Sequence, residues 1–334
     1  MEKNQVELGE PDDDERPLSD RIGVSEPRDI SRCAILASLL EVSASPKPGN
    51  VHRLSSPRQH DKSYEQFLSA IASLGSHFRD VAEIGFILGR GNKAIEPDLH
   101  LGPVFLAALG DMMEWQNGGN LLLGHVLLLL PLAVATGATI GYGKSTIRDI
   151  RGVLDHVLAS GNTEDVINLY EGIQKCNPGG MGAVDRFDLN NSSFDTELRD
   201  ANAQFRDVFA ASSETDWISQ EWMSVFRITF LESFPRLRTL VPALGINDAI
   251  VQLFLELLAT RPDSLILRKS GQDAVEVTTK ARACVDAGGM QTREGREMIE
   301  QLDAELVERK LNPGTTADLI AAAVFLLLVT GFKL

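Results

Sequence analysis

The stretch YEQFLSAIASLGSHFRDVAEIGFIL, residues 64–88, decides the fold class. Its large apolar residues recur at spacings of three and four, which is the period of one face of an α-helix. They are Phe67, Ile71, Leu74, Phe78, Val81, Ile84 and Ile87. This pattern predicts one long amphipathic helix whose apolar stripe packs against a core.

The same period continues along most of the chain, and no segment shows the alternation of a convincing strand. Residues 179–194 and 235–245 are candidate insertions or internal boundaries, and we expect the first, which is rich in Gly, Asn, Ser and Asp, to be a loop. The predicted fold is all-α, a single compact multi-helix globule of ten or more helices. The further helices are expected at residues 104–113, 121–136, 145–159, 164–176, 198–211, 217–230, 247–260, 272–287, 293–310 and 316–330.

The composition limits the class of protein. A chain of 334 residues with 43% hydrophobic residues can bury a sizeable core. Its net charge of −15 argues against general nucleic-acid binding, because the summed field repels a phosphate backbone. Residues 1–28 hold nine Asp or Glu against four Lys or Arg, which predicts a disordered acidic tail before a helical domain at 29–334.

Cysteines and apolar runs bear on the location of the protein. Cys33, Cys176 and Cys284 are odd in number and far apart, which fits a reducing cytoplasm better than a disulfide framework. The apolar runs 121–134 and 319–329 are shorter than the roughly 20 residues of a membrane span. We therefore expect a soluble cytoplasmic protein in which both runs are buried core helices.

The run from Glu41 to Arg53, EVSASPKPGNVHR, ends an apolar segment with a carboxylate and then breaks the helix. Lys47, Gly49 and Arg53 place cations and backbone N–H groups in one loop, an arrangement that suits a polyphosphate. The alternative is a plain helix stop with solvated charges.

Pro-Gly turns recur at three helix junctions, Pro48–Gly49, Pro178–Gly179 and Pro313–Gly314. Backbone donors and acceptors are free at helix ends. Several such ends meeting at one place would form a polar cleft within an apolar bundle. We expect an active-site cleft at helix ends on this ground.

Thr315 and Thr316 precede the last predicted helix, and Asp318 falls in its first turn. Thr315-x-x-Asp318 is a capping-box pattern, in which side chains bind the exposed N–H groups. The alternative is that this N-terminus receives a phosphate while Asp318 helps to hold Mg²⁺. The two roles do not exclude each other.

The segment NPGTTADLIAAAVF, residues 312–325, resembles the second hallmark of the triphosphoribosyl-dephospho-CoA synthase family, and the Pro-Lys-Pro-Gly turn resembles the first. Residues 118–124, 177–182 and 263–271 resemble further segments of the archaeal branch in the same order. The resemblance covers about residue 30 to the C-terminus.

The resemblance implies an all-helical transferase that moves the 5-triphosphoribosyl group of ATP to a hydroxyl of dephospho-CoA and releases adenine, with Mg²⁺ and no nucleic-acid or membrane partner. It implies that Glu41, Asp61 and Asp318 supply the metal ligands, and that one of them is the base. The residues expected to bind phosphate or nucleotide are Lys47, Gly49, Arg53, Asn120, Asp263, Arg268, Gly314, Thr315 and Thr316.

The chain departs from the family pattern at two places. PRQHD, residues 57–61, replaces a glycine-containing His-x-Asp element, which leaves the acceptor open, and Leu121 replaces a Thr after Asn120. His125 has no partner at ligand spacing and is expected to be a core or surface residue. The rival functions are a related transferase with another acceptor and a non-catalytic nucleotide-binding sensor or scaffold. Exposed apolar helix faces would suit a homodimer.

Overall fold

The computed structural model describes residues 20–55, 61–95, 99–179 and 185–334. These residues form helices and connecting loops, and the β pairing among them is an isolated bridge between Arg21 and Thr146. The predicted all-α fold is confirmed. The first helices are α1 (Pro27–Ser43), α2 (Tyr64–Ser73), α3 (Gly75–Arg90), α4 (Leu101–Glu114), α5 (Leu123–Gly141), α6 (Ile147–Ala159) and α7 (Thr163–Cys176). They are followed by α8 (Phe194–Ala201), α9 (Phe205–Ala210), α10 (Trp217–Ser224), the π-helix η2 (Ile228–Ser233), α11 (Phe234–Thr260), α12 (Ser264–Ser270), α13 (Asp273–Asp286), the 3-10 helix η3 (Gly289–Gln291), α14 (Arg293–Glu308) and α15 (Gly314–Val329).

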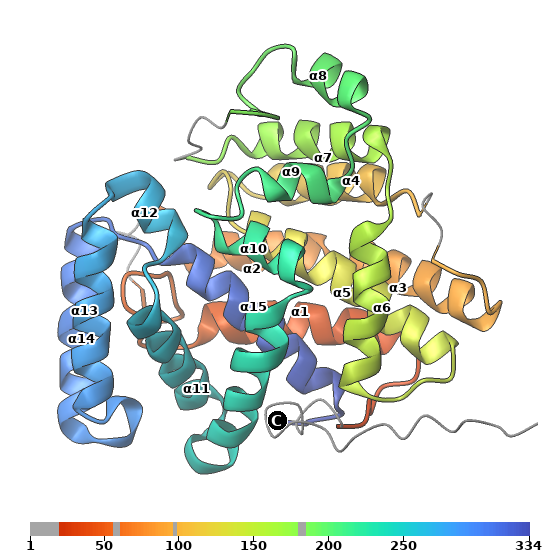
Figure 1. The fold of residues 1–334 in the computed structure, drawn as a ribbon. Helices are drawn as coiled ribbons and strands as arrows, with labels where there is room; N and C mark the ends of the chain where they lie inside the picture. Colours follow the sequence, from red (N-terminus) through yellow and green to blue (C-terminus); the bar gives the residue numbers. More distant parts are fainter. Residues whose placement is uncertain (1–19, 56–60, 96–98, 180–184) are drawn as a thin grey trace, which may run out of the picture.

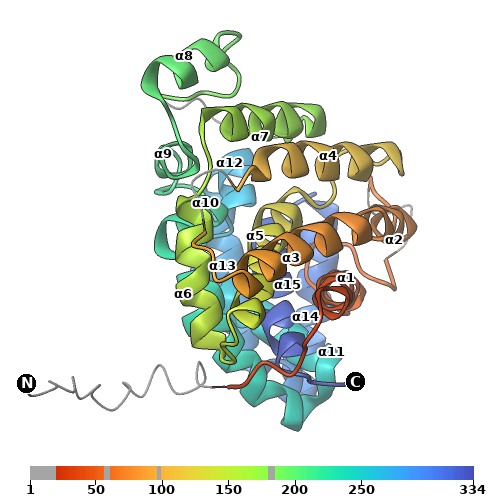
Figure 2. The ribbon, with the colours of Figure 1, turned by 90° about the vertical axis from the view of Figure 1, so that its right-hand side faces the viewer.

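Helices α5 and α15 form the centre of the core, with the other helices around them (Figures 1 and 2). Every residue of α5 from Gly124 to Thr139 is buried, as is every residue of α15 from Leu319 to Val329. Both helices are apolar on all faces, as helices surrounded by neighbours must be. The prediction that these runs are buried core helices is confirmed.

Two described segments are long and apolar enough to cross a membrane, Leu123–Gly141 and Ile228–Thr260. The apolar window of the first is 89% buried inside the fold. Its neighbours in the fold are other helices, so its composition is explained by its place in the core.

Helices α3 and α5 meet through small residues. A Cβ atom at Gly85 of α3 would lie 2.2 Å from the carbonyl oxygen of Val134. A Cβ atom at Gly137 of α5 would lie 2.1 Å from the carbonyl oxygen of Ala82. The two backbones therefore approach more closely than ordinary side chains allow, and glycine is required at the contact.

This contact corrects the predicted apolar stripe. Beyond Val81 the buried face of α3 runs through small residues, so Ile84 and Ile87 are 36% and 61% exposed. The predicted single helix over 64–88 is also two helices, α2 and α3, which meet at Leu74. The spacing of the large apolar residues predicted helices here. It did not predict that the glycine-containing face of α3 is the one that contacts α5.

Residues 235–245, which were predicted as an insertion or internal boundary, are helical. They belong to α11, in which Pro235 lies in the first turn, where its missing N–H needs no partner. The helix kinks at Gly245, whose φ of 72° is in the left-handed region that glycine tolerates.

The described part of the predicted acidic tail is bound to the helical domain. The N–H of Ile22 donates to the carbonyl of Ser145 at 2.7 Å, and the N–H of Gly23 donates to that of Val329 at 2.9 Å. The domain therefore includes residues ahead of the predicted boundary at 29. Residues 1–19 of the tail lie outside the described residues.

The outer helices form two groups. Helices α13 and α14 lie side by side at one flank, on the left of Figure 1. Helices α4, α7, α8 and α9 lie at one end, at the top of Figures 1 and 2. Helices α10 and α12 lie between the two groups and contact α15.

Replacing Gly137 by valine should destabilise the fold by about 2–3 kcal/mol, because the added side chain collides with the carbonyl of Ala82. Urea unfolding followed by circular dichroism measures this loss. Gly152 is the control, since a Cβ atom there meets nothing within 4 Å, and Gly152→Ala should raise stability by about 0.5–1 kcal/mol. A wild-type midpoint for Gly137→Val would contradict the close approach of α3 and α5.

Candidate active site

A cavity of about 1020 Å³ opens between the ends of several helices. Gly49, Gly179 and Gly314 line it, so the structure brings together the three Pro-Gly turns that lie far apart in the sequence. Ligand sites in proteins commonly enclose about 300–1,000 Å³. The cavity is therefore large enough for a nucleotide with part of a second substrate.

A buried ion pair lies where α1 ends. Glu41 is 3% exposed and Lys47 is fully buried, and the Lys47 ammonium bonds the Glu41 carboxylate. The ammonium also donates to Oδ1 of Asn50 at 2.9 Å. Nδ2 of Asn50 donates in turn to Oδ1 of Asn312 at 2.9 Å. The Pro-Lys-Pro-Gly turn is thereby tied to the segment that leads into α15.

Lys47 supports the loop from inside and does not line the cavity. Burial lowers the pKa of its ammonium, while the carboxylate of Glu41 opposes that shift. Burial would raise the pKa of Glu41, but Lys47 and then His125 outweigh it and hold that pKa below its usual value. The predicted contact of Lys47 with phosphate therefore conflicts with its position.

Arg53 also lies away from the cavity wall. Its Nη1 donates to the carbonyl oxygen of Ser43 at 2.6 Å and to Oδ1 of Asn247 at 2.7 Å. These bonds join the end of α1 to α11. In this structure Arg53 holds the loop, and its binding of phosphate stays a prediction.

Gly49 lines the cavity, but its N–H is engaged. That N–H donates to Oδ1 of Asp303 at 2.9 Å. A Cβ atom at Gly49 would lie 2.2 Å from the carbonyl oxygen of Leu311, and its φ is 72°. The glycine is required by the tight turn, whatever ligand the cavity receives.

His125, in the first turn of α5, lies between two carboxyl groups. Its Nε2 is 3.5 Å from Oε2 of Glu41 and 3.5 Å from Oδ1 of Asp318. Its Nδ1 is 3.1 Å from Oγ of Ser38. His125 is buried, as expected for a core histidine, but it also has partners that sequence spacing did not show, because they come from α1 and α15. Its place directly after the motif at 118–124 was the signal that could have identified it.

The carboxyl group of Asp318 faces the cavity and is 19% exposed. Burial, and after it the nearby carboxylates of Glu41, Asp263 and Asp216, raise the pKa of Asp318 well above its usual value. A Cβ atom at Gly124 would lie 2.0 Å from Oδ2 of Asp318, so glycine leaves room for this carboxyl group. A carboxyl group with a raised pKa in a cavity is a candidate acid or base.

The capping box predicted at Thr315 and Asp318 does not form. Asp263 caps the N-terminus of α15 instead, because its Oδ2 accepts from the N–H of Thr316 at 2.7 Å and from Oγ1 of Thr316 at 2.8 Å. Asp318 is therefore free to turn toward the cavity.

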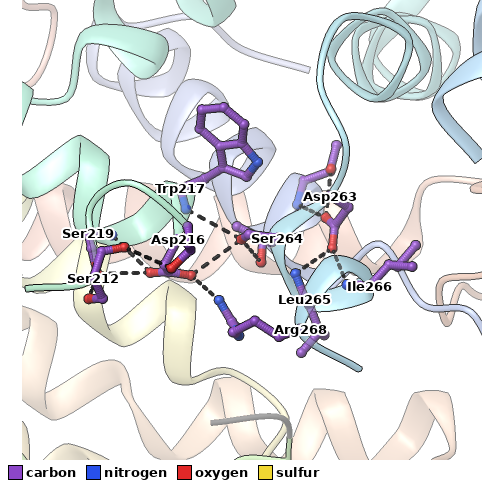
Figure 3. A network of polar contacts seen from close by, with 12 residues as sticks. Ser212, Asp216, Trp217, Ser219, Asp263, Ser264, Leu265, Ile266 and Arg268 are labelled. Atoms are coloured by element: carbon purple, nitrogen blue, oxygen red, sulfur yellow. Dashed lines mark hydrogen bonds and ion pairs between the residues drawn. The ribbon is translucent and has the colours of Figure 1, made fainter. Parts of the chain in front are cut away.

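The same carboxylate caps a second helix (Figure 3). Oδ1 of Asp263 accepts from the N–H groups of Leu265 at 2.9 Å and Ile266 at 3.1 Å, in the first turn of α12. Burial raises the pKa of Asp263, and these hydrogen bonds oppose that shift. Asp263 and Thr316 lie behind the cavity wall, so their predicted contact with a nucleotide conflicts with their position.

A polar network joins α10, α12 and α15 on the cavity wall (Figure 3). The guanidinium of Arg268 pairs with Asp216. Oγ of Ser264 lies 3.3 Å from Oδ1 of Asp216 and 3.0 Å from Oγ1 of Thr315. Arg268 and Thr315 both line the cavity, and their binding of phosphate or nucleotide stays a prediction, although the charge of Arg268 is already engaged by a carboxylate.

Asn120 and Asp61 line the cavity at its loops. Oδ1 of Asn120 accepts from the N–H of Leu123 at 3.2 Å, at the start of α5. Asp61 lies on the rim with its side chain 84% exposed, 3.5 Å from Nζ of Lys310. Asp61 is thus exposed to solvent, whereas Glu41 is buried.

The three predicted metal ligands do not form one cage. Glu41 is engaged by Lys47 and His125, and Asp61 is on the exposed rim. Among the described residues, no group of three or more His, Cys, Asp or Glu side chains has the arrangement of a metal site. Mg²⁺ in nucleotide sites is commonly held by one or two carboxylates together with substrate phosphates. The residues present fit that looser arrangement and do not fit a three-carboxylate site.

Helix ends that enclose carboxyl groups and cations in one large cavity define a site for a phosphorylated small molecule, as in a group-transfer enzyme. Residues 27–333 match the model of the CitG family, described as ATP:dephospho-CoA triphosphoribosyl transferase. The match covers most of the chain, and the chain belongs to this family.

Individual relatives agree with the family match. The 2-(5''-triphosphoribosyl)-3'-dephosphocoenzyme-A synthase of Klebsiella pneumoniae is 24% identical over 304 residues, which are 87% of each chain. A protein of Streptococcus equi subsp. equi to which the same activity is ascribed is 24% identical over 89% of this chain and 95% of its own. A crystal structure from Archaeoglobus fulgidus, described as a triphosphoribosyl-dephospho-CoA synthase, shares the fold with a TM-score of 0.59 and 24% identity, over 80% of this chain and all of the other.

Replacing Lys47 by methionine should destabilise the protein by about 3–5 kcal/mol, because Glu41 would keep a buried charge without its partner. Guanidinium chloride unfolding measures the loss. The double variant Glu41→Gln with Lys47→Met should recover part of the stability, since it buries no charge. A Lys47→Met protein of wild-type stability would show that Lys47 does not support the loop.

Proposed function

We propose that this protein transfers the 5-triphosphoribosyl group of ATP to a hydroxyl group of 3′-dephospho-CoA and releases adenine. Family membership over residues 27–333 supports the reaction class. The observation that carries the proposal is the contact of Glu41, His125 and Asp318 at the wall of a cavity of about 1020 Å³.

The reaction breaks the bond between C1′ of the ribose and N9 of adenine, and it forms a bond between C1′ and the acceptor oxygen. The acceptor hydroxyl loses a proton, and adenine gains one. Positive charge develops at the ribose as the adenine leaves, so negative charge in the pocket stabilises the transition state. A carboxyl group beside the sugar would serve both purposes: it would accept the proton of the acceptor hydroxyl, and its negative charge would stabilise the positive charge at the ribose.

Asp318 is our candidate for that group. It faces the cavity, and its raised pKa makes the carboxylate a stronger base than an ordinary aspartate. The ring of His125 lies within 3.5 Å of the Asp318 carboxyl group and of Glu41, and so fixes the orientation of Asp318. Lys47 holds Glu41 from the other side.

We propose that the phosphates of ATP would hold Mg²⁺, with Asp61 as the single protein ligand, since Asp318 serves as the base. When bound it would neutralise phosphate charge.

Three further proposals concern the context of the enzyme. A cytoplasmic location is supported by three free cysteines, all buried. The archaeal-type branch is supported by the motif at residues 118–124. A homodimer is supported by the exposed side chains of Ile84 and Ile87 on α3.

Full-length protein incubated with Mg-ATP and 3′-dephospho-CoA should release adenine and form a product of the combined mass, both measured by chromatography and mass spectrometry. Asp318→Asn should slow the release by roughly 10²–10⁴-fold, because it removes the proton acceptor. Formation of ADP or free phosphate in place of adenine would refute the proposal. If adenine is released only with a different hydroxyl acceptor, the proposed reaction type stands and dephospho-CoA is not the acceptor.

Asp318→Asn should also be more stable than the wild type at pH 8. The folded-state pKa of Asp318 is raised, so its stabilising contribution is complete below the unfolded-state pKa and is lost as the pH rises through the folded-state pKa. Asparagine cannot ionise and avoids that loss. Thermal unfolding should show a gain of about 2 °C or more at pH 8 and a smaller one at pH 4. An equal or lower Tm for the variant at pH 8 would contradict the raised pKa.

A further inference from the structure

Among the residues that the structure describes, four cationic side chains line the cavity, and two of them are paired with carboxylates. The four are Lys62, Arg268, Lys269 and Lys310. Arg268 pairs with Asp216, and Lys310 lies 3.5 Å from Asp61. These two cations therefore have part of their charge balanced by the protein itself.

Within the described part of the chain, neither Lys62 nor Lys269 forms an ion pair with a carboxylate. Within the described residues, Lys269 has neither a hydrogen bond nor an ion pair. The Lys62 ammonium donates to the carbonyl oxygen of Asn120, which is a neutral group. Burial lowers the pKa of Lys62, and the ammonium of Lys269 lowers it further, so the two charges are close enough to repel. Asp61 offsets only part of this.

The backbone around the two lysines leaves room for a ligand. Gly119 lines the cavity beside Asn120, its φ is 74°, and a Cβ atom there would meet nothing within 4 Å. Gly179 also lines the cavity and places Lys269 there, because the Lys269 stem packs against it: a Cβ atom at Gly179 would lie 3.2 Å from Cε of Lys269. Lys269 comes from α12, whereas Lys62 lies next to Ser63, the N-cap residue of α2. Two ammonium groups from separate elements thus reach one open space, which is the requirement for holding a chain of phosphates.

We infer that Lys62 and Lys269 form a polyphosphate-binding site on the wall of the cavity, and that this site receives the triphosphate of ATP. The inference rests on the proposed function for the identity of the nucleotide. It assigns the phosphate contacts to Lys62 and to Lys269, which lies in the segment 263–271, in place of Lys47 and Arg53. A bound polyanion would remove the repulsion between the two ammonium groups and take up charge that the protein leaves unbalanced.

The test is calorimetric titration of the full-length protein with inorganic tripolyphosphate at low ionic strength. Lys62→Met and Lys269→Met keep the length of the side chain and remove its charge. Each should weaken tripolyphosphate binding by roughly 10-fold or more, the loss expected for a charge-assisted hydrogen bond. Lys269→Arg should retain more affinity than Lys269→Met. Lys144→Met is the matched control, since Lys144 is exposed and does not line the cavity.

The outcomes separate this inference from the proposed function. If the wild type fails to bind tripolyphosphate, or if both methionine variants bind it like the wild type, the site is refuted, even when adenine is released. If binding depends on both lysines but no adenine is released from ATP, the site stands and the proposed reaction fails. Lys269 is exposed, so Lys269→Met carries the test should Lys62→Met fold poorly. The KM for ATP should rise in the same variants.

Discussion

The buried ion pair of Lys47 and Glu41 is the interaction on which the site depends. Removing two charges from water costs several kcal/mol for each ion, so the pair persists only with close contact and further hydrogen bonds. Asn50 supplies such a bond to Lys47 and passes the connection to Asn312, ahead of α15. The other oxygen of Glu41 faces His125. One carboxylate thus fixes the loop after α1 and also orders the groups beside the cavity.

Much of the fold could be predicted from the period of the apolar residues. The central helices α5 and α15 are apolar on every face, and their burial followed from that alone. The failures have specific causes. The contact of Gly85 with α5 is made by a residue without a side chain, which a pattern of large apolar residues cannot show. Pro235 was interpreted as a break, although the first turn of a helix accepts proline.

The sequence predicted which turns meet at the cavity, but it predicted fewer of the side-chain contacts there. The Pro-Gly turns and Asp318 lie on its wall, because helix ends with free backbone groups gather where the apolar core stops. The charge of Lys47 and Arg53 was evident in the sequence, but the direction of each side chain was not. That direction depends on partners such as Asn247, 194 residues from Arg53. His125 was missed for the same reason, since its partners belong to other helices.

The two sets of hydrogen bonds to Asp263 connect two helices of the cavity wall. Its carboxylate holds the first turn of α12 with one oxygen and the first turn of α15 with the other. Lys269 is on α12, and Asp318 is on α15. One side chain therefore fixes both helix ends against each other, and the positions of Lys269 and Asp318 at the cavity are set together.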